Sequence, residues 1–222
     1  MRLVKLAIMI SLFGLGIVNA EEQAADMGDL TKIKAAFKET WVNPDVDFTR
    51  FNKLFLWESR FEYRDVGPAK KTQSTMMSSR NREFGISDTD RQKFEEIVKE
   101  AFVKGVQRAK KVELSNAIGP NTLIMRAAVL DIISLVPPET IGRSDVYLSS
   151  VGEATLVLEL LDADTGDVVA VVSERRAMGR TGGMDSMTMP TNSATILSEI
   201  RRWAQSAGSK LGSELDKAIS GK

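Results

Sequence analysis

The chain has 222 residues with no cysteine and no histidine, and its 30 Lys and Arg residues balance its 30 Asp and Glu residues. Without Cys and His, disulfides, thiol nucleophiles, Ser-His-Asp triads and zinc sites built on thiolate or imidazole are excluded. The balanced charge gives no overall attraction to nucleic acid, so we expect no nucleic-acid partner. With 43% hydrophobic and 27% charged residues, the composition is typical of a globular domain.

The first twenty residues have the pattern of a secretory signal peptide. Arg2 and Lys5 precede an apolar run over 6–18, and Val18-Asn19-Ala20 offers small or modest residues at the expected cleavage position. The run of thirteen residues is shorter than the about 20 residues that a membrane-spanning helix needs. We therefore expect residues 1–20 to be removed, with no transmembrane anchor after cleavage and a periplasmic location, or a secreted one as the alternative.

The N-terminal extension, residues 21–46, contains three apolar residues at helical spacing: Leu30, Ile33 and Phe37. This spacing predicts one short amphipathic helix, and Asn43-Pro44 ends it because the residue before proline avoids the helical region. We assign residues 47–222 to a single α+β domain.

Two long strands are predicted by alternating side chains. In the first, over 53–64, one face is expected to carry Phe55, Trp57, Phe61 and Tyr63. Its charged far half suits a sheet edge. The second strand covers 122–134 and stops before Pro137-Pro138, and one of its faces is expected to carry Leu123, Met125, Ala127, Val129 and Ile133. A further short strand is predicted near 112–114.

Two helices have clear signals. The first begins after Ser87, which forms a predicted capping box with Asp90, and carries an unbroken apolar stripe. We expect Gly105 beside this stripe to allow a close approach to the sheet. The second helix covers about 191–219, and its two internal glycines, Gly208 and Gly212, predict a bend or two halves.

A hairpin organises the rest of the chain. Its apolar runs, 154–161 and 168–172, flank the polar turn 162–167. Continuous Leu and Val residues indicate strands covered at least partly on both faces, at the centre of the sheet. The turn resembles a calcium loop, but it lacks Asp or Asn at the fifth position, Gly at the sixth and Glu at the twelfth, so we interpret it as a hairpin turn. Consecutive strands joined by turns predict an α+β two-layer sandwich: a mainly antiparallel sheet with two long helices on one face.

One group of residues suggests metal binding. Four methionines lie close together in a glycine-containing segment: Met178, Met184, Met187 and Met189. Thioether ligands select Cu(I), so a Cu(I)-binding periplasmic protein is one alternative. The other interpretation is that these flexible side chains only fill gaps in packing.

A second alternative is a glycan hydrolase that uses two carboxylates, with Asp131 and Glu159 as the acid–base pair. These residues could instead form ion pairs with Arg126 or Arg175 across neighbouring strands. The basic segment 66–84 also has two interpretations: a solvated loop, or a site for an anionic partner.

Several residues together form a recognisable set: Gly152-Glu-Ala154, Glu159-Leu160, Asp162-Ala-Asp-Thr-Gly166, Arg175-Arg176 and the helix that contains Trp203. This set resembles the domain-of-unknown-function 3313 family of bacterial exported proteins and lipoproteins. The resemblance implies an exported protein, but it brings no established activity, cofactor or catalytic residue. The chain departs from the lipoprotein members because it has no lipobox cysteine.

The sequence contains no recognisable set of catalytic residues, and we expect no cofactor. Our hypothesis is therefore a non-enzymatic, exported binding or envelope-associated module that acts through contacts with an envelope protein or a glycan.

Overall fold

The computed structural model describes residues 28–66, 83–137, 147–179 and 188–221. The long elements are the strands β3 (Lys53–Tyr63), β5 (Thr122–Ser134), β7 (Ser150–Asp162) and β8 (Val168–Gly179) and the helices α1 (Asp88–Val106) and α2 (Ser193–Ile219). The short elements are β1 (Thr31–Lys32), β2 (Glu39–Val42), the 3-10 turn η2 (Phe48–Arg50), β4 (Glu113–Ser115), β6 (Tyr147–Leu148) and β9 (Met189–Pro190).

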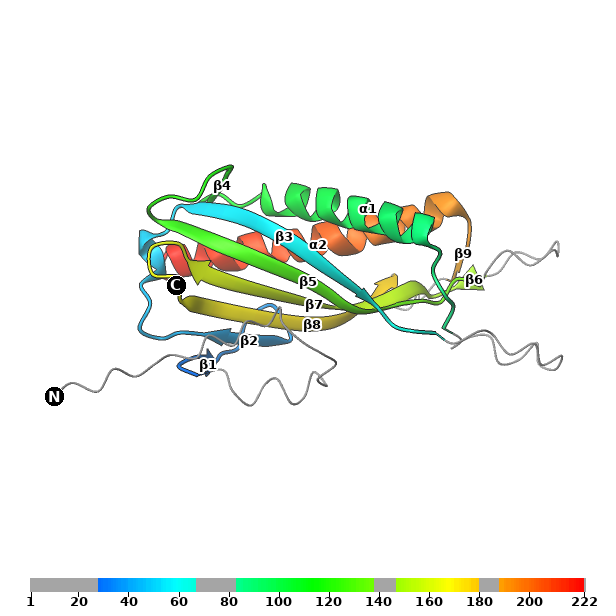
Figure 1. Ribbon diagram of the computed structural model, residues 1–222, viewed down its shortest axis with the longest axis horizontal. Coiled ribbons are helices and arrows are strands. Elements are labelled where there is room, and N and C mark those ends of the chain that lie inside the picture. Colours follow the sequence, from blue (N-terminus) through cyan, green and yellow to red (C-terminus); the bar gives the residue numbers. More distant parts are fainter. Residues whose placement is uncertain (1–27, 67–82, 138–146, 180–187, 222) are drawn as a thin grey trace.

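Seven strands form one sheet in the order β1-β2-β8-β7-β5-β3-β4 (Figure 1). All neighbours are antiparallel except β3, which runs parallel to both β5 and β4. The predicted hairpin, β7 with β8, is confirmed, and β7 is the central strand. Beyond Phe55, β3 has no partner on its outer side among the described strands, which agrees with the predicted edge.

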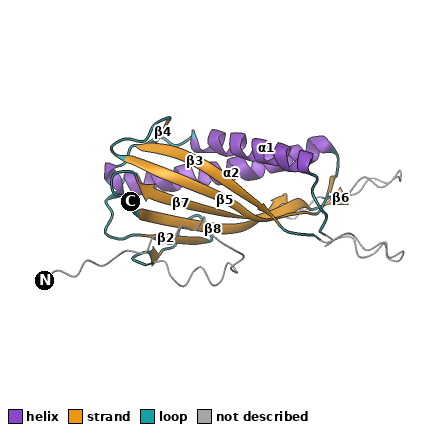
Figure 2. Cartoon of the chain, viewed as in Figure 1, coloured by secondary structure: helices purple, strands orange, loops and turns teal. Residues whose placement is uncertain are grey.

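Both long helices lie on one face of the sheet and run in the same direction, which confirms the predicted two-layer α+β sandwich (Figure 2). Each begins at a capping side chain, because the Ser87 hydroxyl accepts from Asp90 N and the Asn192 side chain accepts from Thr195 N. Within the described part of the chain, no helix is both long enough and apolar enough to cross a membrane.

The hydrophobic core lies between the helices and the sheet. The central strand contributes every second side chain to it: Ala154, Leu156, Leu158 and Leu160. On the opposite face of β7 the side chains from Glu153 to Glu159 are only partly buried, because no helix of the described part of the chain lies there, although Leu161 is buried. We call this face the open face.

Two irregularities in the strands correct the predicted faces. Between Leu56 and Ser59, β3 has one residue more than β5, and this bulge reverses the alternation. As a result Leu54, Leu56, Phe61 and Tyr63 face the core, whereas Phe55 and Trp57 lie on the open face.

In β5 the corresponding irregularity lies at Asp131, which has φ 53. It places Ile132, rather than the predicted Ile133, on the core side with Val129. Strict two-residue periodicity cannot predict either bulge, because each inserts a residue without changing the apolar composition.

The predicted short helix in the extension is wrong. The segment instead forms the hairpin β1–β2, and β2 pairs with β8, so residues 39–42 belong to the main sheet rather than to a separate extension. Of the three apolar residues on which the helix prediction rested, only Phe37 is buried, and Ile33 is 46% exposed. The alternation Thr40-Trp41-Val42, with β-branched residues on both sides of a tryptophan, was the stronger signal.

The glycines of the helices form a contact between the two helices, whereas Gly105 was predicted to approach the sheet. Gly105 approaches α2 rather than the sheet, since a Cβ atom there would lie 2.3 Å from Gln205 O. Gly208 approaches α1, and a Cβ atom there would lie 2.2 Å from Phe102 O. The predicted division into two halves is wrong, because α2 continues unbroken past Gly208 and Gly212. These glycines let the two helices touch backbone to backbone.

We expect Gly208→Ala to destabilise the protein by about 1–3 kcal/mol, because the added methyl group overpacks a backbone contact. This loss would occur although alanine favours a helix by about 1 kcal/mol over glycine. Urea unfolding monitored by circular dichroism measures the difference. The control is Gly85→Ala, where a Cβ atom would meet no heavy atom within 4 Å. Equal stability of Gly208→Ala and the unchanged protein would contradict the contact.

Candidate binding surface

A row of five side chains crosses the open face. Register pairs Trp41 of β2 with Val171 of β8, Val171 with Glu159 of β7, and Glu159 with Arg126 of β5. The next strand, β3, meets this row at its bulge, which contains Trp57. We call Trp41, Val171, Glu159, Arg126 and Trp57 the cross-sheet row.

The ends of the cross-sheet row are aromatic and accessible. Trp57 is 49% exposed and packs edge-on against Phe55, with ring centroids 5.9 Å apart. Trp41 is partly exposed, and the Lys32 ammonium lies 5.6 Å from its ring centroid. Tryptophan rings combine a large apolar area with an N–H donor, so such positions suit a contact surface.

The centre of the row is an ion pair. Arg126 Nη1 donates to Glu159 Oε2 at 3.4 Å, and the Glu159 side chain is only 12% exposed. Four steps between neighbouring strands separate Trp41 from Trp57, which corresponds to about 19 Å. Val171 is only 4% exposed, so the most accessible parts of the row are its two tryptophan ends. Ends this far apart fit a macromolecular partner better than a small molecule.

A second ionic group lies at the β5 bulge. Arg64 donates to the two Asp131 oxygens at 2.6 and 2.5 Å, and Arg175 Nη1 donates to Oδ2 at 2.6 Å. Arg175 also contacts Glu153, and Arg64 contacts Glu83. The hydrogen bonds from Arg64 hold the pKa of the Asp131 carboxyl below its usual value, with Arg175 acting in the same direction and partial burial opposing both.

The two carboxylates considered as an acid–base pair therefore each have an arginine partner. Asp131 is bound by Arg64 and Arg175, and Glu159 is bound by Arg126. The interpretation that these residues form ion pairs across strands is confirmed. Whether the chain also has an enzymatic activity stays an open prediction.

The turn after β7 is a tight hairpin turn, as predicted, with Gly166 at φ 78. Asp162, only 1% exposed, accepts a hydrogen bond from Asp164 N at 2.9 Å and is bound by Arg50 of η2. This carboxylate thus fastens the turn to the segment before β3. Sequence reasoning missed Arg50, because the two residues are far apart in the chain.

The methionine group is only partly described. Met178 lies in the core and is 2% exposed. Met184 and Met187 lie outside the described residues, as does most of the basic segment 66–84, and Met189 forms part of β9, where its backbone pairs with Leu148. Cu(I) binding therefore stays a prediction.

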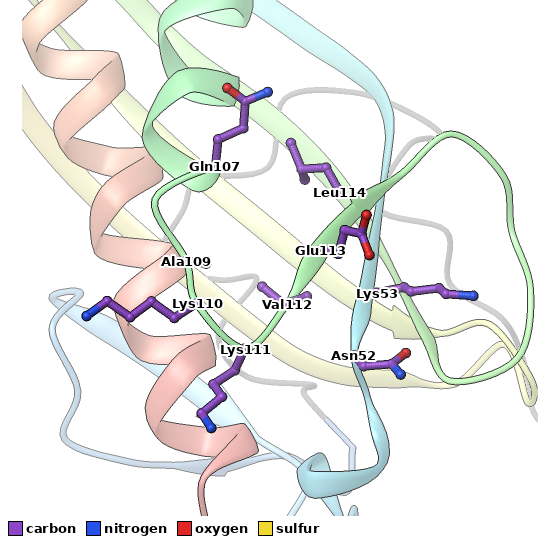
Figure 3. A pocket seen from close by; sticks show the side chains of 9 residues that line it. All are labelled: Asn52, Lys53, Gln107, Ala109, Lys110, Lys111, Val112, Glu113 and Leu114. Carbon is purple, nitrogen blue, oxygen red and sulfur yellow. The ribbon is translucent and has the colours of Figure 1, made fainter.

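A shallow pocket lies where α1 leads into β4 (Figure 3). Three lysines line it, but Lys53, Lys110 and Lys111 point in different directions rather than toward a common centre. The backbone amides of Lys110 and Lys111 already donate to the Asp216 carboxylate at 2.7–2.9 Å. The loop amides are therefore satisfied by α2, and this pocket is a weaker candidate than the cross-sheet row.

We expect Asp131→Asn to lower stability at neutral pH, because it removes the charge that Arg64 and Arg175 neutralise. Asparagine keeps the size of the side chain and tolerates positive φ. Because the pKa of Asp131 is lower in the folded state, its stabilisation is complete above the unfolded-state value of about 3.9 and is lost as pH falls through the folded-state value. The difference in stability between Asp131→Asn and the unchanged protein should therefore become smaller in acid. Urea midpoints of both proteins, measured at several pH values, test this.

The control for this measurement is Asp45→Asn, which removes a carboxylate from an exposed position. A difference that stays constant with pH, or one that Asp45→Asn reproduces, would show that the Asp131 ion pairs do not stabilise the fold.

Comparison with known proteins finds only distant structural similarity. No family model and no curated protein matches the chain. A PelC dodecamer from Paraburkholderia phytofirmans has 15% identity and a TM-score of 0.33, covering 86% of this chain and 98% of that one. The DUF330 protein XCC0632 from Xanthomonas campestris has 13% identity and a TM-score of 0.38, covering 81% and 91%. A neuraminyllactose-binding hemagglutinin homolog from Helicobacter pylori has 14% identity and a TM-score of 0.32, covering 75% and 81%. At these values the similarity carries no information about function, and membership of the domain-of-unknown-function 3313 family stays a prediction.

Proposed function

We propose that this chain is a non-enzymatic binding module of the bacterial envelope, and that its open face holds a partner protein. The observation that carries the proposal is the cross-sheet row, in which two tryptophans flank an Arg126–Glu159 ion pair on a face that neither helix covers. Trp57 is the anchor, because it is the most exposed aromatic ring of the row.

The composition of the row favours a protein partner. Tryptophan and arginine are the residue types that contribute most to protein–protein binding when they become buried. The centre of the row is an ion pair formed within the chain, so covering it leaves neither charge without an opposite one. A glycan could stack on the tryptophan rings, and the experiment below separates the two partners.

Two further observations support a binding role and an envelope location. The carboxylates considered for catalysis are held by arginines rather than directed at a common cleft, as Asp131 with Arg64 shows. The segment 1–20 has the pattern of an export signal, and the residues that resemble the domain-of-unknown-function 3313 family point to the same compartment. We infer a periplasmic location from these sequence features.

The proposal predicts site-specific cross-linking at the open face. A photoreactive amino acid at Glu58, an exposed position next to Trp57 in the β3 bulge, introduced in living cells, should give an adduct that contains peptides of a second protein and that glycan-degrading enzymes leave intact. The same amino acid at Lys93, an exposed position on α1, is the control. Isolation of the partner then permits affinity measurement, and Trp57→Ala should cost at least about 2 kcal/mol, or roughly thirtyfold.

Because Trp57 is half exposed, Trp57→Ala should leave the urea midpoint nearly unchanged, which separates loss of binding from loss of folding. Equal attachment from positions 58 and 93 would contradict the open face as the binding surface. An adduct sensitive only to glycan-degrading enzymes would replace the protein partner by a glycan.

A further inference from the structure

A cavity of about 610 Å3 lies on the helix side of the sheet, below the loop 33–38 that joins β1 to β2. Small-molecule sites have volumes of about 300–1,000 Å3, so the cavity is large enough for a ligand. Its walls come from the loop, β2, β8 and the last turns of α2. They are mainly apolar, with Phe37, Phe48, Val172, Leu211 and Leu215 among the lining residues.

One buried polar group in this wall lacks a partner. Thr40 lines the cavity and is 5% exposed, and its Oγ1 makes no hydrogen bond to any described residue. Buried side-chain hydroxyls in proteins normally have a partner, because an unpaired one has lost its hydration without compensation. The oxygen is covered by protein atoms in this side-chain position, so a ligand oxygen would restore the missing hydrogen bond after rotation of the Thr40 side chain about χ1.

The charged residues that line the cavity are Lys34, Glu214 and Lys217, which carry a net positive charge. Ile33 N donates to Thr40 O at 2.9 Å, so Lys34 follows directly after the residue paired with Thr40. Lys34 is exposed, lines the cavity and has no ion-pair partner in the described ranges. At the α2 side of the cavity, Lys217 is already neutralised by Glu214 at 2.6 Å. Lys34 is therefore the lining charge left without a partner in the described part of the chain, and it favours an anionic group.

The roof of the cavity is held in place without a ligand. Phe37 is 3% exposed, and the Lys210 ammonium lies 4.7 Å from the centroid of its ring. Lys210 is itself fixed by Glu174 of β8 at 2.8 Å. The loop is thus anchored to both α2 and β8, which makes the cavity a built feature rather than a gap under a loose segment.

We propose that this cavity binds the single acyl chain of an anionic amphiphile, a long-chain carboxylate. The chain lies between α2 and the sheet, the Thr40 hydroxyl donates to a carboxylate oxygen, and Lys34 neutralises the charge. The hydrophobic effect supplies affinity in proportion to the buried chain, and the two polar groups fix its orientation. This site is on the opposite face of the sheet from the cross-sheet row and does not depend on the partner proposed there.

Calorimetric titration of the delipidated full chain with palmitate tests the proposal. We expect one palmitate per chain, and weaker binding of hexadecanol, which has the same chain length but no charge for Lys34. Thr40→Val keeps the shape of the side chain and removes the hydroxyl, so palmitate binding should weaken by about fivefold to tenfold. Because the hydroxyl has no partner, the ligand-free variant should be at least as stable as the unchanged protein in urea.

A second pair of variants covers the case in which Thr40→Val fails to fold. Ala218 lines the cavity, so Ala218→Trp should abolish binding by filling it. Ser213→Trp adds the same side chain at an exposed position on the same helix, outside the cavity, and should bind palmitate normally. Absence of palmitate binding, unchanged binding by Ala218→Trp, or binding only to diacyl phospholipid vesicles would overturn the proposal.

Discussion

The contact on which the structure depends is the backbone approach of α1 to α2 at Gly105 and Gly208. Because these residues have no side chains, the helices lie close enough to form one layer that covers the strands from β3 to β8 on a single face. The carboxylate of Asp216 extends the same contact by accepting from the amides after α1. With both helices committed to one face, the other face of the same strands is left for contacts outside the core.

The hairpin near the N-terminus gives both faces of the sheet a role. Successive residues of β2 point to opposite sides, so Trp41 lies on the open face while Thr40 and Val42 line the cavity. The same alternation in β8 places Val171 in the cross-sheet row and Val172 in the cavity wall. Each of the two strands thus contributes to both surfaces. An inserted residue in either strand would move its side chains to the opposite faces.

Sequence patterns predicted the elements whose signals are local. The Ser87 cap, the stripe of α1 and the turn at Gly166 each depend on residues within one turn or one hairpin, and each was confirmed. The bulges at Trp57 and Asp131 were missed because an inserted residue leaves composition unchanged. The partners of the glycines and of Arg50 could not be predicted either, since they depend on how distant segments pack. The cross-sheet row is of the same kind: its five residues come from five strands, and only register aligns them.

The pairing of β2 with β8 has a consequence for the order of assembly. Thr40 pairs with Val172, more than half the chain away, whereas α1 and β3 find each other over a short stretch. During synthesis from the N-terminus, β2 is made early and β8 late. The backbone groups of β2 that pair with β8 therefore stay unpaired until β8 has been made. The two sides of β2, with Trp41 on one and Thr40 on the other, are therefore completed only after β8 has been made.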